Sequence, residues 1–88
     1  MFEKNVTVIN KLGIHARPAG SIVRAATTFK SKVELVRDGN IADAKSIMNV
    51  MMLAAAKGTV VTVRADGEDE QEAVQAVIGL FEGKFNEE

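Results

Sequence analysis

The sequence predicts an α+β fold in which helices cover one face of an antiparallel sheet, with the element order βαββαβα. Three observations lead to this prediction. Short runs typical of strands are separated by segments in which apolar residues recur every three or four positions. The pair Asp38-Gly39 is typical of a two-residue hairpin, which makes its flanking strands antiparallel. No repeat or linker interrupts the pattern, so we expect a single domain over residues 1–88.

The first half of the chain is expected to hold three strands and one helix. Phe2–Ile9 reads as a strand, and the turn Asn10–Gly13 follows it. Ala16–Thr28 carries apolar residues at helical spacing. Lys32–Arg37 and Asn40–Asp43 flank the hairpin pair. The second of these strands is short and polar, as expected of a strand at the edge of a sheet.

The second half is expected to hold two helices and one strand. A helix follows Ser46, a favoured N-cap residue, and runs from Ile47 to about Ala56. Thr59–Asp66 is rich in β-branched residues and reads as the fourth strand. Asp69, with Glu72 three residues later, resembles a capping box that starts the last helix. The apolar face of that helix is Ala73, Val74, Val77, Ile78, Phe81 and Phe85.

The composition excludes several classes of protein. The formal net charge is -1, so no basic excess draws the chain to nucleic acid or to an anionic membrane. There is no cysteine, which excludes disulfides and zinc–thiolate sites. The first residues lack the apolar core of a signal peptide, and the longest apolar run, Val50 to Ala56, is too short to span a bilayer. We expect a cytoplasmic monomer without a metal or a cofactor.

One stretch, Leu12–Gly20, holds the only histidine and the only proline of the chain. Pro18 fits a helix only in its first turn, which places His15 at or near the N-cap. The free N–H groups of Ala16 and Arg17 and the Arg17 guanidinium would then surround the imidazole with anion-binding groups. Neutral imidazole is a good nucleophile, so this pattern predicts a histidine that carries a phosphoryl group. The alternative is a histidine that only packs, caps or faces solvent.

The helix after Ser46 is apolar on almost every side, and one small helix cannot bury all of them in a domain of this size. We therefore expect some of its apolar side chains to be exposed, which usually marks a contact surface. The alternative is that its methionines fill gaps in the core. Arg24, on the first helix, either meets acidic groups of a partner or is a solvated surface charge. The expected docking face comprises Ala16, Gly20, Arg24, Ile47, Met48 and Met51.

Two motifs resemble those of a known family. The run Gly13–Ala19, GIHARPA, resembles the active-site signature of HPr, the histidine-containing phosphocarrier of the bacterial phosphoenolpyruvate-dependent sugar phosphotransferase system. The run Lys45–Met48, KSIM, resembles the family's second signature, around its regulatory serine. The resemblance extends over the whole chain, including its length. It implies an open-faced β-sandwich of four antiparallel strands with three helices on one side.

The resemblance also implies a function. His15 would accept a phosphoryl group on Nδ1 from the phosphohistidine of enzyme I and pass it to sugar-specific enzyme IIA domains. The protein would be a carrier with a covalent intermediate rather than a stand-alone enzyme. Ser46 would be the target of an ATP-dependent kinase/phosphorylase in lineages that possess one, and the phosphorylated form would bind a transcriptional regulator. A plain N-cap role for Ser46 and a nitrogen-related phosphocarrier branch remain alternatives.

Two other classes of protein fit the composition less well. A small RNA-binding α+β domain stacks bases on aromatic side chains of its sheet, and this chain has neither tyrosine nor tryptophan. A regulatory domain that binds a small molecule needs a polar-lined pocket, and none can be read from the sequence.

Overall fold

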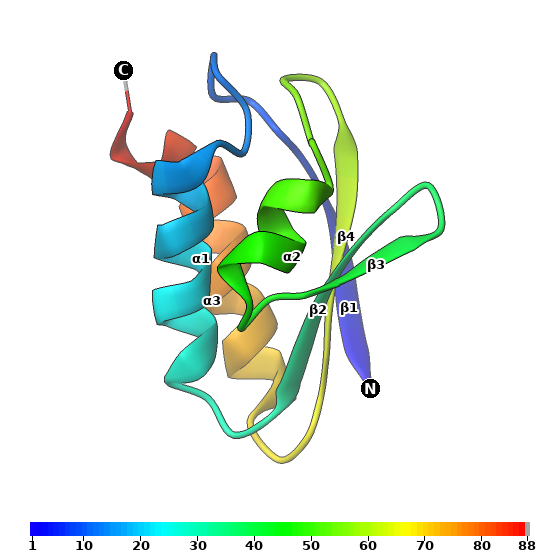
Figure 1. Cartoon of the computed structure of the whole chain (residues 1–88). Helices are drawn as coiled ribbons and strands as arrows, with labels where there is room; N and C mark the ends of the chain where they lie inside the picture. Colours follow the sequence, from blue (N-terminus) through cyan, green and yellow to red (C-terminus); the bar gives the residue numbers. More distant parts are fainter. Residues whose placement is uncertain (88) are drawn as a thin grey trace.

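The structure, a computed structural model, describes residues 1–87 (Figure 1). Its elements follow the predicted order and confirm the α+β class. They are β1 (Phe2–Thr7), α1 (Ala16–Thr27), β2 (Lys32–Arg37), β3 (Asn40–Asp43), α2 (Ile47–Met52), β4 (Val60–Asp66), α3 (Glu70–Glu82) and the short 3₁₀ helix η1 (Lys84–Asn86). Three ends differ from the prediction by one or two residues: the last residues of β1 and α1 and the first residue of β4. Helix α3 begins directly after Asp69, the N-cap residue that the sequence indicates.

The four strands form one antiparallel sheet in the order β1-β4-β2-β3. Leu35 of β2 lies opposite Val63 on one side and Ala42 on the other, which fixes the register of the three strands. The short polar strand β3 lies at an edge, as predicted. The three α-helices lie on one face of the sheet and leave the other face open (Figure 1). This is the open-faced sandwich that the resemblance implies.

The core lies between the sheet and the helices, because alternate strand residues point toward the helical layer. Val33 and Leu35 are buried, whereas Glu34 between them faces outward and forms a 2.8 Å ion pair with Arg64 of the neighbouring strand. The helices contribute apolar residues at three- and four-residue spacing. The largest of these that are fully buried are Ile22, Val50, Val74, Val77 and Phe81.

Helix α2 is shorter than predicted, since it ends at Met52 instead of near Ala56. Its last N–H groups bond only three residues back, from Leu53 to Val50 and from Ala54 to Met51. Ala54 then takes a left-handed conformation with φ +52°, which stops the helix. The next carbonyl, that of Ala55, accepts a 2.9 Å hydrogen bond from the Ile14 N–H. A tertiary contact therefore replaces the last turn of this helix.

The predicted capping box at the start of α3 is wrong. Asp69 is the N-cap residue, but its carboxylate makes no cap hydrogen bond. It accepts instead from the backbone N–H groups of Lys30 and Ser31, each at 2.9 Å, and from the Ser31 hydroxyl. Glu70, not Glu72, bonds the preceding turn, through the N–H of Gly67. The two carboxylates thus tie down the turns beside the helix.

The last helix ends at Glu82, so Phe85 does not belong to it as predicted. Residues 84, 85 and 86 all have positive φ, which reverses the chain direction. Phe85 is nevertheless buried, with its ring edge-on to Phe81 at 5.0 Å between centroids. This turn brings Glu87 back over the start of α1.

Candidate functional site

His15 is the N-cap of α1, as the sequence predicts, and its side chain is 37% exposed. Its imidazole makes no cap hydrogen bond. The N–H groups of Ala16 and Arg17 have no acceptor within residues 1–87, and Pro18 has no N–H. The first bond of the helix runs from the Ala19 N–H to the His15 carbonyl, at 3.0 Å. Two donors at the positive end of the helix dipole are therefore available beside the imidazole.

The loop before His15 is held by close backbone contact with the loop after α2. Gly13 has φ +69°, and a Cβ at this position would lie 2.6 Å from the Ala55 carbonyl oxygen. The N–H of Ile14 bonds the same carbonyl, and the Ile14 side chain is buried. His15 therefore projects from a backbone that is anchored on both sides.

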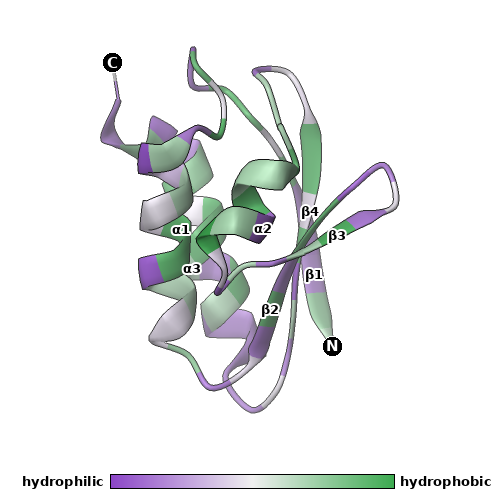
Figure 2. Ribbon diagram, in the orientation of Figure 1, coloured by the Kyte–Doolittle hydropathy of each residue, from purple (hydrophilic) through white to green (hydrophobic). Residues whose placement is uncertain are grey.

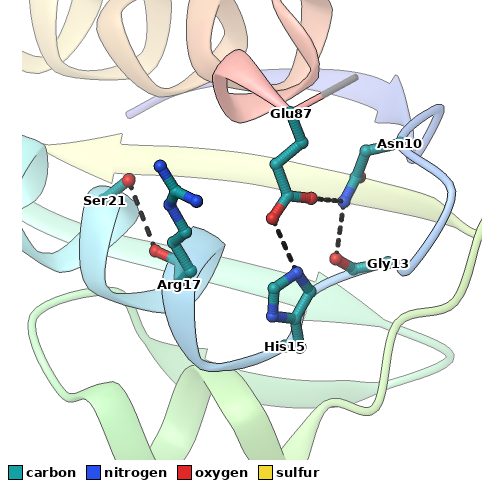
Figure 3. Close-up of polar contacts among 6 residues, drawn as sticks. All are labelled: Asn10, Gly13, His15, Arg17, Ser21 and Glu87. Atoms are coloured by element: carbon teal, nitrogen blue, oxygen red, sulfur yellow. Dashed lines mark hydrogen bonds and ion pairs between the residues drawn. The ribbon is translucent and has the colours of Figure 1, made fainter.

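The sequence reasoning missed Glu87, whose side chain meets the imidazole (Figure 3). His15 Nε2 lies 2.7 Å from Glu87 Oε2. The other carboxylate oxygen, Oε1, accepts from Asn10 Nδ2 at 3.1 Å, and the same Nδ2 donates to the Gly13 carbonyl at 2.6 Å. No local sequence pattern predicts that Glu87 belongs to the site. Asn10 gave one signal of a buried polar contact, because it is a polar residue at the inward position that follows Val6 and Val8.

Arg17 lies in the first turn of α1 and is exposed. Its side chain and Glu87 line an open hollow with a volume of about 490 Å³. Within residues 1–87, no carboxylate pairs with its guanidinium. In Figure 3, the Arg17 side chain and the His15 ring project to the same side of the start of α1. It is therefore a cation available to an anion at this hollow.

The expected docking residues lie on two neighbouring helices. A Cβ at Gly20 would lie 3.4 Å from Arg24 Nη1 and 3.9 Å from Ile47 Cδ1, so this glycine sits between an exposed cation and the apolar helix. Ile47, Met48 and Met51 are exposed, as predicted, and Met52, which we did not include, is 77% exposed. Figure 2 shows that α2 is hydrophobic over most of its length. An exposed apolar surface thus adjoins α1.

Ser46 is the N-cap of α2 and is half-buried. Its hydroxyl oxygen accepts from the Asn49 N–H at 3.3 Å and from Asn49 Nδ2 at 3.1 Å. Ile47 and Met48, two residues of the exposed apolar surface, follow it directly. The N-cap role that the sequence predicts is confirmed.

Comparisons with known proteins match this sequence and this fold. The family model described as "PTS HPr component phosphorylation site" matches residues 2–83. The phosphocarrier protein HPr of Xylella fastidiosa strain Temecula1 is 51% identical over 88 residues, which cover 100% of this chain and 99% of that protein. The crystal structure of HPr-C-His from Thermoanaerobacter tengcongensis has a TM-score of 0.95 and 43% identity, covering 100% of this chain and 99% of that one. A crystal structure of an HPr dimer from the same organism has a TM-score of 0.79 and 42% identity, covering 99% of this chain and 100% of that one.

The family model and the relatives match nearly the whole length of the chain, and the solved structure has the same open-faced sandwich. The chain is therefore a small phosphocarrier protein. The chain belongs to the HPr family, the phosphocarriers of the phosphotransferase system. Within residues 1–87, no helix has the length and apolar character needed to cross a membrane.

Proposed function

We propose that His15 carries the phosphoryl group, which it accepts from the phosphohistidine of enzyme I and passes to enzyme IIA domains. One observation carries the proposal: a half-exposed imidazole stands directly before a helix whose N–H groups at Ala16 and Arg17 have no acceptor within residues 1–87. Phosphoryl transfer spreads negative charge over the oxygens of the moving group. Donors already in place stabilise that charge without reorganisation.

We assign the new bond to Nδ1 of the ring. Nε2 already contacts the Glu87 carboxylate at 2.7 Å, which supports Nδ1 as the reacting nitrogen. In the transfer, the Nδ1 lone pair forms a bond to phosphorus while the N–P bond of the donor breaks. Arg17 then faces the transferred group with a fixed positive charge. The same step in reverse, toward an acceptor imidazole, releases the group again.

The test is a phosphorylation assay with phosphoenolpyruvate and enzyme I. The chain should gain a phosphate that is labile in acid and stable in alkali, and His15→Ala should gain none. Since the sequence holds one histidine, the position of this phosphate is unambiguous. A chase with enzyme IIA domains should remove the label. Transfer only to nitrogen-related acceptors would place the chain in the other branch, and a label that persists in His15→Ala would overturn the proposal.

We propose further that phosphorylation of Ser46 regulates this carrier. Its hydroxyl lies at a helix start, where the dipole favours a phosphate, so the added charge should leave the fold intact. The charge would lie at the rim of the exposed apolar surface and oppose an acidic partner. Ser46→Asp should therefore slow phosphorylation by enzyme I, with Ser46→Asn, which keeps a capping side chain, as the control. Equal rates in the two variants would contradict the regulatory role.

The remaining expectations concern location and assembly. We propose that the chain works as a monomer in the cytoplasm, because a carrier must leave its donor before it meets its acceptor. A small and transient contact surface suits that task. Size-exclusion chromatography with light scattering measures the oligomeric state, and a stable dimer would contradict the proposal.

A further inference from the structure

We propose that Glu87 is a positioning residue for phosphoryl transfer: its carboxylate holds the proton of the His15 imidazole on Nε2 and leaves the Nδ1 lone pair free to attack phosphorus. This inference rests on the proposed function, in which His15 is the residue that carries the phosphoryl group. It adds to that function a residue near the end of the chain that acts through the imidazole.

The contact between the two side chains sets the tautomer. Nε2 of His15 and Oε2 of Glu87 are 2.7 Å apart, a normal distance for a charge-assisted hydrogen bond. An ionised carboxylate only accepts hydrogen bonds, so Nε2 must be the nitrogen that carries the proton. A neutral imidazole has one N–H, and Nδ1 therefore keeps its lone pair. The Glu87 side chain is 14% exposed, which limits competition from water.

The carboxylate is itself held in place by Asn10. Oε1 of Glu87 accepts from Asn10 Nδ2 at 3.1 Å, and Asn10 is fully buried. Nδ2 also donates to the Gly13 carbonyl, so both of its neighbours are acceptors and the orientation of the amide is determined. The amide keeps this orientation although Asn10 Oδ1 is buried without a partner among the described residues. Figure 3 shows the resulting chain of contacts from the loop through Glu87 to the ring.

This arrangement removes any need to move a proton during transfer. The Nδ1 lone pair forms the new N–P bond, the N–P bond of the donor breaks, and its electron pair returns to the donor imidazole. The proton on Nε2 stays, so the phosphorylated ring carries a formal positive charge beside the Glu87 carboxylate. In onward transfer this ring leaves phosphorus as a neutral imidazole. Glu87 thus assists both acceptance and release, as a carboxylate assists histidine in the serine protease triad.

The test compares Glu87→Ala and Glu87→Gln with wild type in the full-length chain. Glu72→Gln is the matched control, because Glu72 is an exposed glutamate in the first turn of α3. Nitrogen-15 NMR of the His15 ring should show Nδ1 unprotonated and Nε2 protonated in wild type, and a mixture of both tautomers in Glu87→Ala. The initial rate of phosphorylation by enzyme I should fall about tenfold in Glu87→Ala, the size expected for a lost hydrogen bond to a charged group. Glu87→Gln should lose less, because its amide oxygen still accepts.

Two results would overturn the proposal. One is an unchanged tautomer together with wild-type rates in Glu87→Ala, and the other is an equal loss of rate in Glu72→Gln. Both leave the proposed function standing, since wild type would still be labelled. A wild-type chain that takes up no phosphate would overturn the proposed function, and the NMR measurement, which needs no donor, would still decide whether Glu87 orders the ring.

Discussion

The Ala55 carbonyl oxygen lies 2.6 Å from the point that a Cβ on Gly13 would occupy. Two loops that are distant in the sequence therefore meet backbone to backbone, and a glycine is required where they meet. Because Gly13 lies two residues before His15, this contact positions the candidate phosphorylation site. It links the end of α2 to the start of α1.

Gly13→Ala should destabilise the protein and slow its phosphorylation. The new methyl group would occupy a left-handed conformation and overlap the Ala55 carbonyl, which we expect to cost about 2–3 kcal/mol. The control is Gly39→Ala, since Gly39 also has positive φ but has nothing within 4 Å of its Cβ position. It should lose about 1 kcal/mol and keep the wild-type transfer rate. Urea unfolding and the enzyme I assay measure both effects, and equal losses in the two variants would contradict the role of the contact.

Phe85→Ala should destabilise the fold and separate Glu87 from His15. The ring is 5% exposed and packs on Phe81, so its removal should cost about 3 kcal/mol. The control is Met52→Ala, which removes a 77% exposed side chain and should change the free energy of unfolding by less than about 0.5 kcal/mol. Urea unfolding measures the first effect and NMR of the imidazole the second. An undisturbed imidazole in Phe85→Ala would show that the C-terminal turn does not depend on this ring.

Met48→Gln should weaken docking without altering the fold. Met48 is 65% exposed on α2, so its loss costs little folding energy. If the apolar surface binds enzyme I, KM for the carrier should rise roughly fivefold while kcat stays constant. Val60→Thr is the control, because Val60 is exposed in β4 next to buried Val61 and thus lies on the open face of the sheet. A rise of KM in the control alone would assign docking to the sheet instead.

The protein should lose stability in acid because the Asp69 carboxylate becomes protonated. The Ser31 hydroxyl, followed by the Lys30 N–H, lowers the pKa of the Asp69 carboxyl from its ordinary value of 3.8 to about 2. Because the pKa is lower in the folded state than in the unfolded chain, the carboxylate contributes stability above pH 3.8. That contribution should disappear as the pH falls from about 4 to about 2.

The measurement is the urea midpoint across that pH range in wild type and in Asp69→Asn. Asn should flatten the fall, since it cannot titrate and accepts through one oxygen only. Glu34 and Glu70 also have lowered pKa values, because Arg64 hydrogen-bonds the first and the Gly67 N–H the second, so only the difference between the two curves reports Asp69. The exposed Asp38→Asn serves as the control. Parallel curves for wild type and Asp69→Asn would contradict the prediction.

The sequence by itself determined the elements and the position of the histidine. Alternation along the strand places Val33 and Leu35 on the same face, and the structure buries both. The Asp38-Gly39 pair predicts a hairpin, and both of its residues have positive φ. Pro18, which lacks an N–H, was enough to place the start of α1 directly after His15. These features could be predicted because strand periodicity, turn chemistry and helix starts depend on residues a few positions apart.

Only the tertiary structure decided what surrounds the imidazole. Glu87 reaches His15 across 72 positions of sequence, through a turn held by the burial of Phe85. The same distinction explains the errors: Ala55 bonds Ile14 instead of extending α2, and Asp69 bonds Ser31 instead of capping α3. A carbonyl or carboxylate bonds whichever donor packing brings within about 3 Å of it, and local sequence does not specify that donor.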